Sequence, residues 1–266
     1  MKSNQKIPDE HKEKLLQILQ DKEKYVVHIR MLQWYLKQGL KLKQIHRVIR
    51  FKQSAWLEPY IKFNTEKRKQ AKTDFEKDFF KLMNNAPYGK TMEDVKNHMD
   101  FELVTDCKRF DKLVHQPTYK ATSIINENIV GVERAKKEIY LNKPIAIGVA
   151  VLDLSKLHMY SFYYDVLKAK YGEDVGLLYT DTDSLIVDVR TEDIYEDIRQ
   201  PSMKEYFDFS EYPTDHPCYD PTNAKVLGKF KCETNGKPIE EWIGLKAEMY
   251  AIRVGGKDKL TAKGVP

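Results

Sequence analysis

The stretch Tyr179-Thr180-Asp181-Thr182-Asp183-Ser184 places two carboxylates one residue apart between two short apolar segments. Residues 176–179 and 185–189 predict two β-strands that meet at a polar turn, so Asp181 and Asp183 project from the tip of a hairpin. Oxygen ligands there suit Mg²⁺, which takes one or two protein carboxylates and completes its shell with water and substrate phosphates. The stretch therefore predicts phosphoryl or nucleotidyl transfer; the alternative is a turn in which Asp and Thr make only local hydrogen bonds.

The charge of the chain is nearly balanced overall but unevenly distributed. Its 266 residues include 45 Lys plus Arg and 40 Asp plus Glu, a formal net charge of +5. This length suffices for one large domain or two small ones. Basic residues concentrate between residues 37 and 96 and return near the C-terminus. Such stripes are usually solvated faces, but beside a metal site they favour a polyanionic partner.

The cysteines and the apolar segments predict an intracellular, soluble chain. Cys107, Cys218 and Cys232 lie far apart without a Cys-x-x-Cys motif, so neither a disulfide framework nor a zinc site is predicted. The first residues lack the apolar segment of a secretory signal, and no segment predicts a membrane span. We therefore expect no membrane partner.

The hydrophobic pattern along the chain predicts an α+β fold without internal repeats. The expected elements are helices over residues 8–38 (ended by Gly39), 64–97 and 144–167 (begun by Pro144), strands over 45–51, 101–105, 119–125 and 129–132, and hairpin turns at Asn235-Gly236 and Gly255-Gly256.

A second polar group, Lys81, Asn85 and Tyr88, stands at i, i+4 and i+7 and so shares one face of the helix expected there. A lysine on this face can meet a triphosphate, and an aromatic ring two turns later can stack on a sugar or base. The plainer alternative is a solvated face. Pro87 fits the helix poorly, because it lacks an N–H and its ring clashes with the carbonyl of Met83. We expect a kink just before Tyr88.

The two motifs resemble those of family B DNA polymerases and follow the order found there. Residues 179–184 resemble the palm motif, and residues 81–89 resemble the fingers motif Lys-x-x-x-Asn-Ser-x-Tyr-Gly, with Ala86 in the serine position. The resemblance extends from about Tyr25 to Gly264. Segments similar to the protein-primed polymerases of Polinton/Maverick-type transposons, kin to those of adenoviruses and linear plasmids, begin at Tyr25 (Tyr-Val-Val-His), Gly39 (Gly-Leu-Lys-Leu), Ile45 (Ile-His-Arg-Val), Asn64 (Asn-Thr-Glu-Lys-Arg) and Asp74 (Asp-Phe-Glu-Lys-Asp-Phe-Phe-Lys).

The resemblance implies a right-hand polymerase fold with fingers, palm and the start of a thumb. It also implies DNA-templated DNA synthesis from deoxynucleoside triphosphates on primer-template DNA, with two Mg²⁺ ions and a terminal priming protein as a further partner. Asp183 would bind both metals, Asp181 would support it, and Lys81 would hold the incoming triphosphate. Arg68 or Lys69 would help to bind the triphosphate. Asn85 and Tyr88 would border the nascent base pair, and Tyr88 would also exclude ribonucleotides. The residues that would contact DNA are Tyr179, Lys246, Tyr250 and Lys263.

The chain departs from this family in its first palm motif and in its thumb. Nothing before Lys67 matches Asp-x-x-Ser-Leu-Tyr-Pro, which supplies the other metal-binding aspartate, and the exonuclease carboxylates are also absent. The string from Asp208 to Pro213 is one residue short and comes too late, so it is interpreted as a turn closed by Tyr-Pro. In the thumb motif Lys-x-Tyr, Glu248 takes the lysine position. The expected division is a helical segment over 1–40, fingers over 41–97, palm over 98–225 without its first strand, and thumb start over 226–266.

The leading hypothesis is the fingers, palm and thumb-start portion of a DNA polymerase that performs two-metal nucleotidyl transfer. Its alternative is a catalytically incomplete remnant that still binds DNA, because two metals about 4 Å apart need carboxylates from two places. A sugar-nucleotide transferase would explain Asp181 and Asp183, but it would explain neither the Lys81 face nor the order of the motifs.

Overall fold

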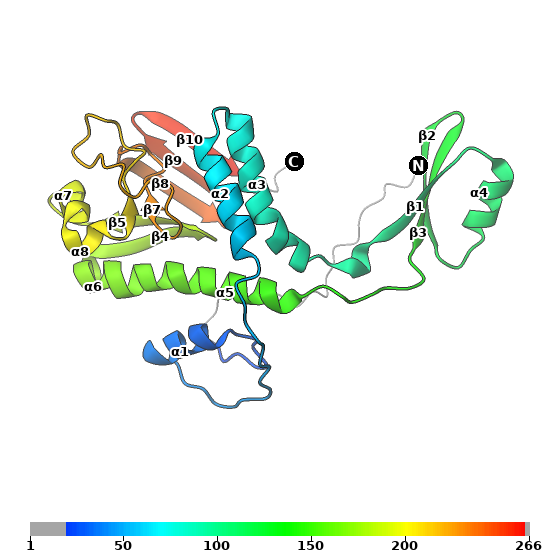
Figure 1. The fold of residues 1–266 in the computed structure, drawn as a ribbon, viewed down its shortest axis with the longest axis horizontal. Helices are drawn as coiled ribbons and strands as arrows, with labels where there is room; N and C mark the ends of the chain where they lie inside the picture. The colour runs from blue at the N-terminus through cyan, green and yellow to red at the C-terminus, as the bar shows by residue number, and fades with distance from the viewer. Residues whose placement is uncertain (1–19, 264–266) are drawn as a thin grey trace.

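A long helical run forms the centre of the molecule, of which the computed structural model describes residues 20–263 (Figure 1). Pro144 occupies the N-cap of this run, so its predicted start is confirmed. Gly172, with a φ of 58°, ends it, because a residue without Cβ adopts this conformation at little cost. Its parts are α5 (Ile145–Ser161), the π-helical turn η2 (Phe162–Leu167) and α6 (Lys168–Tyr171).

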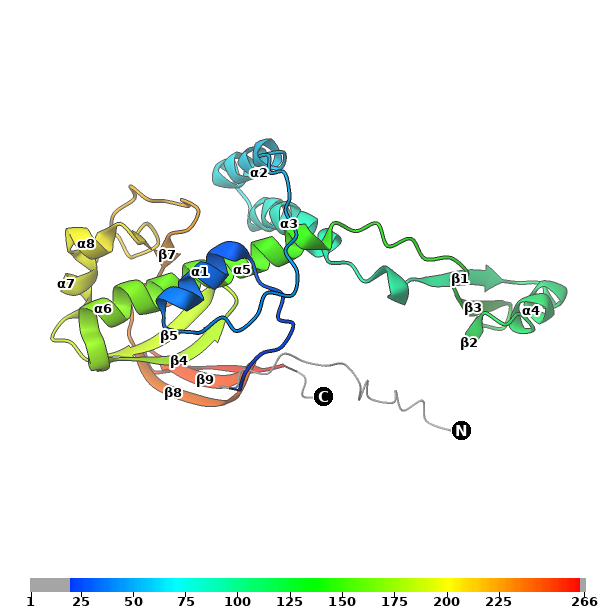
Figure 2. The same cartoon turned by 90° about the horizontal axis from the view of Figure 1, so that it is seen from below.

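The helical run covers one face of a hairpin made of β4 (Val175–Asp181) and β5 (Ser184–Val189), which confirms the two strands predicted around the acidic pair. Phe162 and Leu167 are buried with Val175, and Val187 packs on the same cluster. Because successive strand residues point to opposite faces, the neighbours of Val187 on β5 face away from the helix. Seen from below, the hairpin lies between the helical run and a second sheet (Figure 2).

The second sheet is an antiparallel meander with β9 (Met249–Val254) between β8 (Ile239–Lys246) and β10 (Lys257–Ala262). The predicted turn at Gly255-Gly256 joins β9 to β10, and both glycines have positive φ, as a type I′ turn requires. A two-residue turn at residues 247–248, which the sequence pattern did not predict, joins β8 to β9.

The turn predicted at Asn235-Gly236 forms, with φ values of 52° and 77°, but it joins no hairpin. β7 (Phe230–Lys231) before it pairs in parallel with β6 (Phe207–Asp208), whereas β8 after it pairs with β9. The hairpin prediction was wrong because a local turn signal does not determine which strands pair. Two short helices, α7 (Ile194–Arg199) and α8 (Pro201–Lys204), precede β6.

Two helices, α2 (Glu58–Gln70) and α3 (Asp74–Thr91), replace the single helix predicted over residues 64–97. Thr73 begins α3 with a capping box: its Oγ1 accepts from the N–H of Glu76, whose carboxylate accepts from the N–H of Thr73. The end of α3 rests on the start of α5, where a Cβ at Gly148 would collide with the side chain of Met92. The helical hairpin is thereby mounted on the central helix.

A three-stranded antiparallel sheet with one helix projects from the body as an arm (Figures 1 and 2). β1 (Met99–Val104), β2 (Tyr119–Asn126) and β3 (Ile129–Ala135) confirm the three strands predicted there, with β3 in the middle. The turn η1 (Val95–Asn97) precedes β1, and α4 (Cys107–Val114) covers one face through the buried Leu113.

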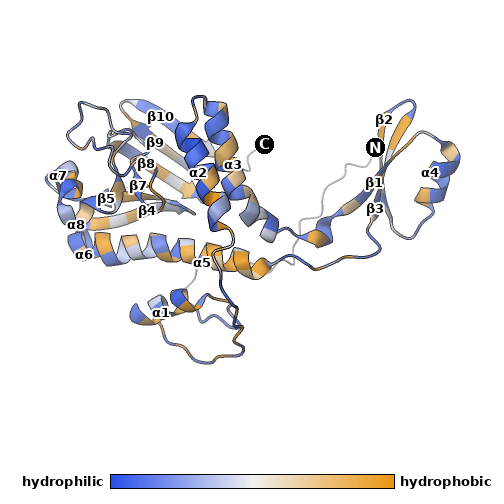
Figure 3. Ribbon diagram, viewed as in Figure 1, coloured by the Kyte–Doolittle hydropathy of each residue, from blue (hydrophilic) through white to orange (hydrophobic). Residues whose placement is uncertain are grey.

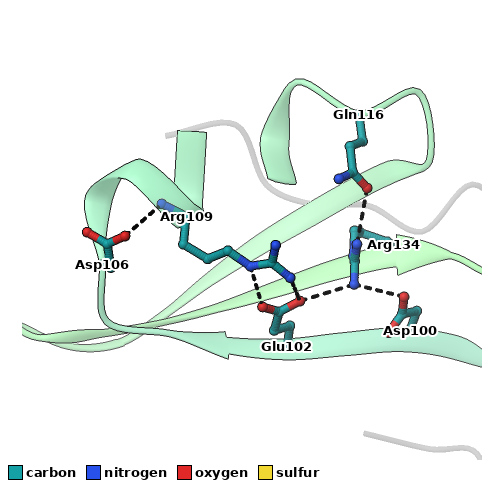
Figure 4. A network of polar contacts seen from close by, with 6 residues as sticks. All are labelled: Asp100, Glu102, Asp106, Arg109, Gln116 and Arg134. Atoms are coloured by element: carbon teal, nitrogen blue, oxygen red, sulfur yellow. Dashed lines mark hydrogen bonds and ion pairs between the residues drawn. The ribbon is translucent and has the colours of Figure 1, made fainter. Parts of the chain in front are cut away.

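Ion pairs reinforce the arm (Figure 4). Arg109 of α4 donates two hydrogen bonds to the carboxylate of Glu102, at 2.7 and 2.9 Å. Arg134 of β3 reaches both Glu102 and Asp100, and its guanidinium also donates to the Gln116 side chain. These contacts join α4 to its sheet without help from the body, so the arm is a separate small unit.

α1 (Ile29–Lys37) is the part of the predicted helix over 8–38 that the structure shows as helical; residues 1–19 lie outside the described residues. It docks on the central helix, where the indole N–H of Trp34 donates to Asp165 at 3.0 Å and the N–H of His28 donates to the buried Asp153. The strand predicted over 45–51 was wrong. Residues 40–55 have no regular secondary structure, because no strand of the described chain pairs with them.

The central helix corrects the expectation that no segment could span a membrane. By length and composition the run Ile145–Asp174 is long and apolar enough to do so: its most apolar 18-residue window has a mean hydropathy of 1.3, and 22% of this window is buried. The start of the run is strongly hydrophobic (Figure 3). The core helix of a soluble protein passes the same test. We describe it as the central helix of the body, because Asp153 and Asp165 accept hydrogen bonds from the α1 segment and Leu167 packs on the β4–β5 hairpin.

Candidate functional site

The tip of the β4–β5 hairpin is held by its own hydrogen bonds. Asp181 pairs with Ser184 across the turn, and Thr182 has a φ of 47°. The main-chain carbonyl of Asp181 accepts from the N–H of Asp183 at 2.5 Å and from the hydroxyl of Ser184 at 3.1 Å, and Thr182 donates to the Asp181 carboxylate at 3.1 Å. These local bonds agree with the turn interpretation, and they also make the tip a rigid mount for the two carboxylates.

The two carboxylates of the tip are in different situations. Asp181 is half-buried, whereas Asp183 is exposed, and its side chain has no hydrogen-bond or ion-pair partner among the residues that the structure describes. On β4, Asp181 lies on the same face as Tyr179, two residues earlier. That face is directed toward the β8–β10 sheet, because the Tyr179 ring centroid lies 4.7 Å from that of Tyr250 and 5.6 Å from that of Trp242.

Lys263 lies near the acidic tip. Its ammonium group is 3.3 Å from the carboxylate of Glu248, and its N–H donates to the carbonyl of the same residue. Glu248 raises the pKa of Lys263, and the nearby Asp181 and Tyr179 raise it further. Tertiary structure thus brings together four residues selected from the sequence: Asp181, Tyr179, Tyr250 and Lys263. Lys246 stands at the end of β8, opposite Met249.

Glu248 has a structural role that the sequence pattern did not reveal. It occupies the second position of the β8–β9 turn with a φ of 58°, and it pairs with Lys263 across the end of the sheet. The ammonium group nearest to Glu248 thus comes from Lys263, the residue after β10. Trp242, which contacts both Tyr179 and Tyr250, was also not identified from the sequence.

The residues at the tip fit a magnesium ion only in part. Two carboxylates match the one or two that Mg²⁺ takes in sites completed by substrate phosphates. Within residues 20–263, however, no group of three or more His, Cys, Asp or Glu side chains is placed to hold a metal. A pair of metals would therefore need a further acidic residue.

Asp208 does not supply that acidic residue. It is buried beside β7, where its carboxylate accepts from the N–H groups of Ser210 and Lys225 at 2.9 and 2.8 Å. Burial by itself would raise the pKa of Asp208, but these hydrogen bonds offset it and the pKa lies below its usual range. Tyr212 is buried in the turn that follows. This arrangement agrees with the interpretation of the string as a structural turn.

The face of α3 that carries Lys81 and Asn85 is open to solvent, and Tyr88 is 37% exposed. The helix runs on past Pro87 to Thr91. The carbonyl of Met83, which Pro87 cannot bond, instead accepts a hydrogen bond from the hydroxyl of Tyr60 on α2, at 3.1 Å. Tyr60 was not identified from the sequence. The carbonyl that lacks its helical hydrogen bond takes a partner from a different helix, and the local sequence does not indicate which residue this is.

α2 places its last basic residues beside the first half of α3. The amide of Asn84 donates to the hydroxyl of Thr65 at 3.2 Å, which sets the register of the two helices. Arg68, half-buried, and Lys69, exposed, lie one turn further along α2. Both views show the tip of the β4–β5 hairpin directed toward the side where α2 and α3 stand (Figures 1 and 2). The two motifs thus share one support, the central helix.

Comparisons of this chain with protein-family models, with curated proteins and with solved structures gave no match. The chemistry of the site therefore has to be inferred from its own residues. They are two carboxylates on a rigid turn, a lysine and two aromatic rings beside them, and a separate open face with a second lysine.

Proposed function

We propose that this chain is the fingers, palm and thumb-start portion of a DNA-templated DNA polymerase of the protein-primed family B type, with a right-hand arrangement of these parts. The observation that carries the proposal is the gathering of Asp181, Tyr179, Tyr250 and Lys263 at one hairpin tip, although they come from β4, β9 and the end of β10. An Asp-x-Asp turn with only a local role would not need a lysine and two aromatic rings from a different sheet.

Each residue group has a role in nucleotide transfer. The exposed Lys81 ammonium binds the triphosphate as a point charge, and Tyr88 borders the sugar. Asp181 and Asp183 hold Mg²⁺, which supplies charge neutralisation and activation of the primer hydroxyl when it is bound. Lys263 meets a primer phosphate, while Tyr179 and Tyr250 support the strand. Primer-template DNA and deoxynucleoside triphosphates are the partners, and a terminal priming protein is a further one.

The second candidate is a remnant that binds DNA without extending it. The two acidic side chains of the tip have no third acidic partner within the described part of the chain, and this favours the second candidate for the chain by itself. Extension would then require a carboxylate supplied from elsewhere. The two candidates share every binding residue and differ only in turnover.

The test separates binding from turnover. We expect the chain to bind primer-template DNA with strong salt dependence, and to bind a deoxynucleoside triphosphate more tightly with Mg²⁺ than without it. Asp183→Asn should abolish this metal-dependent gain and leave DNA binding intact, because the carboxylate neutralises charge rather than supports the fold. Asp188→Asn, at an exposed position on the same hairpin, is the matched control. Equal effects of the two variants would refute the assignment, and primer extension by the chain alone would exclude the remnant.

A further inference from the structure

A pocket separate from the acidic tip lies where α2, α3 and the start of α5 meet. It is a shallow hollow, widely open to solvent, with a volume of about 340 Å³ and mainly apolar walls. Trp56 lines it from the turn before α2, Tyr60 from α2, Pro87 and Lys90 from α3, and Lys143 from the segment before α5. An apolar pocket with aromatic walls and two lysines is suited to a flat ring that carries a negative charge nearby.

The two lysines are fixed by one carboxylate. Glu93 lies 2.7 Å from the ammonium group of Lys143 and 2.8 Å from that of Lys90, and it also contacts His98 at 2.9 Å. Lys143, Lys90 and His98 lower the pKa of Glu93 to about 2, so this carboxylate is ionised at neutral pH. One negative charge facing two ammonium groups leaves one positive charge in excess beside the apolar pocket, and this charge is complementary to a phosphate.

The pocket is distinct from the face assigned to the incoming triphosphate. At roughly 100° per residue, Pro87 and Lys90 lie about 120° to 180° around α3 from Lys81. The two faces meet at the same turn, because Tyr88 follows Pro87 directly.

We propose that this pocket binds one unpaired nucleotide of a single strand, with its base against Trp56 and its phosphate at Lys90 and Lys143. Trp56 is 61% exposed, so a base can reach its ring without rearrangement of the core. Tyr60 is held in place by its bond to Met83 and forms a fixed wall. The assignment of this nucleotide to the template strand rests on the proposed function; the binding of a base and phosphate does not.

The test is carried out on the whole chain in EDTA, so that no metal-dependent step enters. The probes are a labelled oligothymidylate and an abasic oligomer of the same length and charge, and the readout is fluorescence anisotropy. Trp56→Ala should weaken binding of the thymidylate roughly 5- to 150-fold, the range for loss of one base–aromatic stack, and leave the abasic oligomer unchanged. Phe75→Ala, at an exposed aromatic residue at the other end of α3, should change neither.

Two further measurements test whether the nucleotide binds at this pocket. Lys143→Gln should reduce the slope of log affinity against log salt by about 0.7, as expected for one phosphate of a single strand, whereas Lys112→Gln on the arm should not. A 5-bromouracil oligomer should photo-cross-link to Trp56. Equal losses for both probes, no loss, or a cross-link mapped away from the pocket would each overturn the proposal, and the last result would place the oligonucleotide at another site.

The outcome is independent of the polymerase assignment. If Trp56→Ala loses the thymidylate but Asp183→Asn keeps metal-dependent triphosphate binding, the pocket stands and the proposed function fails. The reverse pattern would refute the pocket and leave the proposed function in place.

Discussion

Removal of the negative charge of Glu248 should make Lys263 available to a primer phosphate. The two side chains form an ion pair at 3.3 Å beside Asp181, and their exposed fractions are 47% and 64%. An exposed pair of this kind contributes little to stability, because water and salt screen it. Glu248→Gln keeps the size of the side chain and therefore leaves the fold intact while it frees the ammonium group.

The size of the effect follows from counterion release. One additional phosphate contact steepens the slope of log affinity against log salt by roughly 0.9, so between about 200 and about 50 mM salt the variant gains about 3.5-fold over the parent. Glu248→Lys, which also adds a cation, should steepen the slope by at least the same amount. Anisotropy titrations of labelled primer-template DNA at several salt concentrations measure it. In Glu248→Gln/Lys263→Gln the gain should disappear; an unchanged slope in Glu248→Gln would show that Lys263 never meets the DNA.

Three other expectations follow from single contacts. Lys81→Ala should weaken binding of the deoxynucleoside triphosphate more than that of duplex DNA, because its charge is on the open face of α3; titration with each ligand checks this. Tyr60→Phe should lower the free energy of unfolding by about 0.5–1.5 kcal/mol, and by less in a Pro87→Ala background, where the restored N–H bonds the carbonyl of Met83; urea unfolding of the four proteins measures this coupling. Glu93 has a folded-state pKa of about 2 instead of 4.5, so its stabilising contribution is complete above about 4.5 and is lost as the pH falls toward 2, and Glu93→Gln should flatten this part of a plot of Tm against pH.

Each of these variants has a matched control. Lys112→Ala on the arm carries the same charge change as Lys81→Ala, and equal loss of triphosphate affinity in both would mean a nonspecific charge effect. Additive effects of Tyr60→Phe and Pro87→Ala would show that the Tyr60 hydroxyl does not replace the helical bond. Glu127→Gln lies in an exposed turn and should leave the acid limb of the Tm curve as it is in the parent.

Local elements were predictable wherever neighbouring residues determine them. The β4–β5 hairpin, the start of α5 at Pro144, the Gly255-Gly256 turn and the three strands of the arm all follow from residue spacing, since strand alternation and turn chemistry act within a few residues. The break before α3 also had a local signal, Thr73 followed three residues later by Glu76, which outweighs the continuous helical pattern around it.

Pairing and proximity could not be predicted in the same way. The alternating residues 45–51 form no strand, because a strand needs a partner and none of the described chain pairs with them. The turn at Asn235-Gly236 joins strands of different sheets for the same reason.

The sequence by itself determined which candidate groups the chain carries: two carboxylates one residue apart on a turn, and a lysine, an asparagine and a tyrosine on one helix face. Only the tertiary structure decided what surrounds them. It placed Tyr250 against Tyr179 and Lys263 near Asp181, paired Glu248 with that lysine, and formed the open Trp56 pocket from three separate segments. The physical reason is that turn and helix preferences act within a few residues, whereas these contacts join residues far apart in the chain and depend on how the sheets and helices pack.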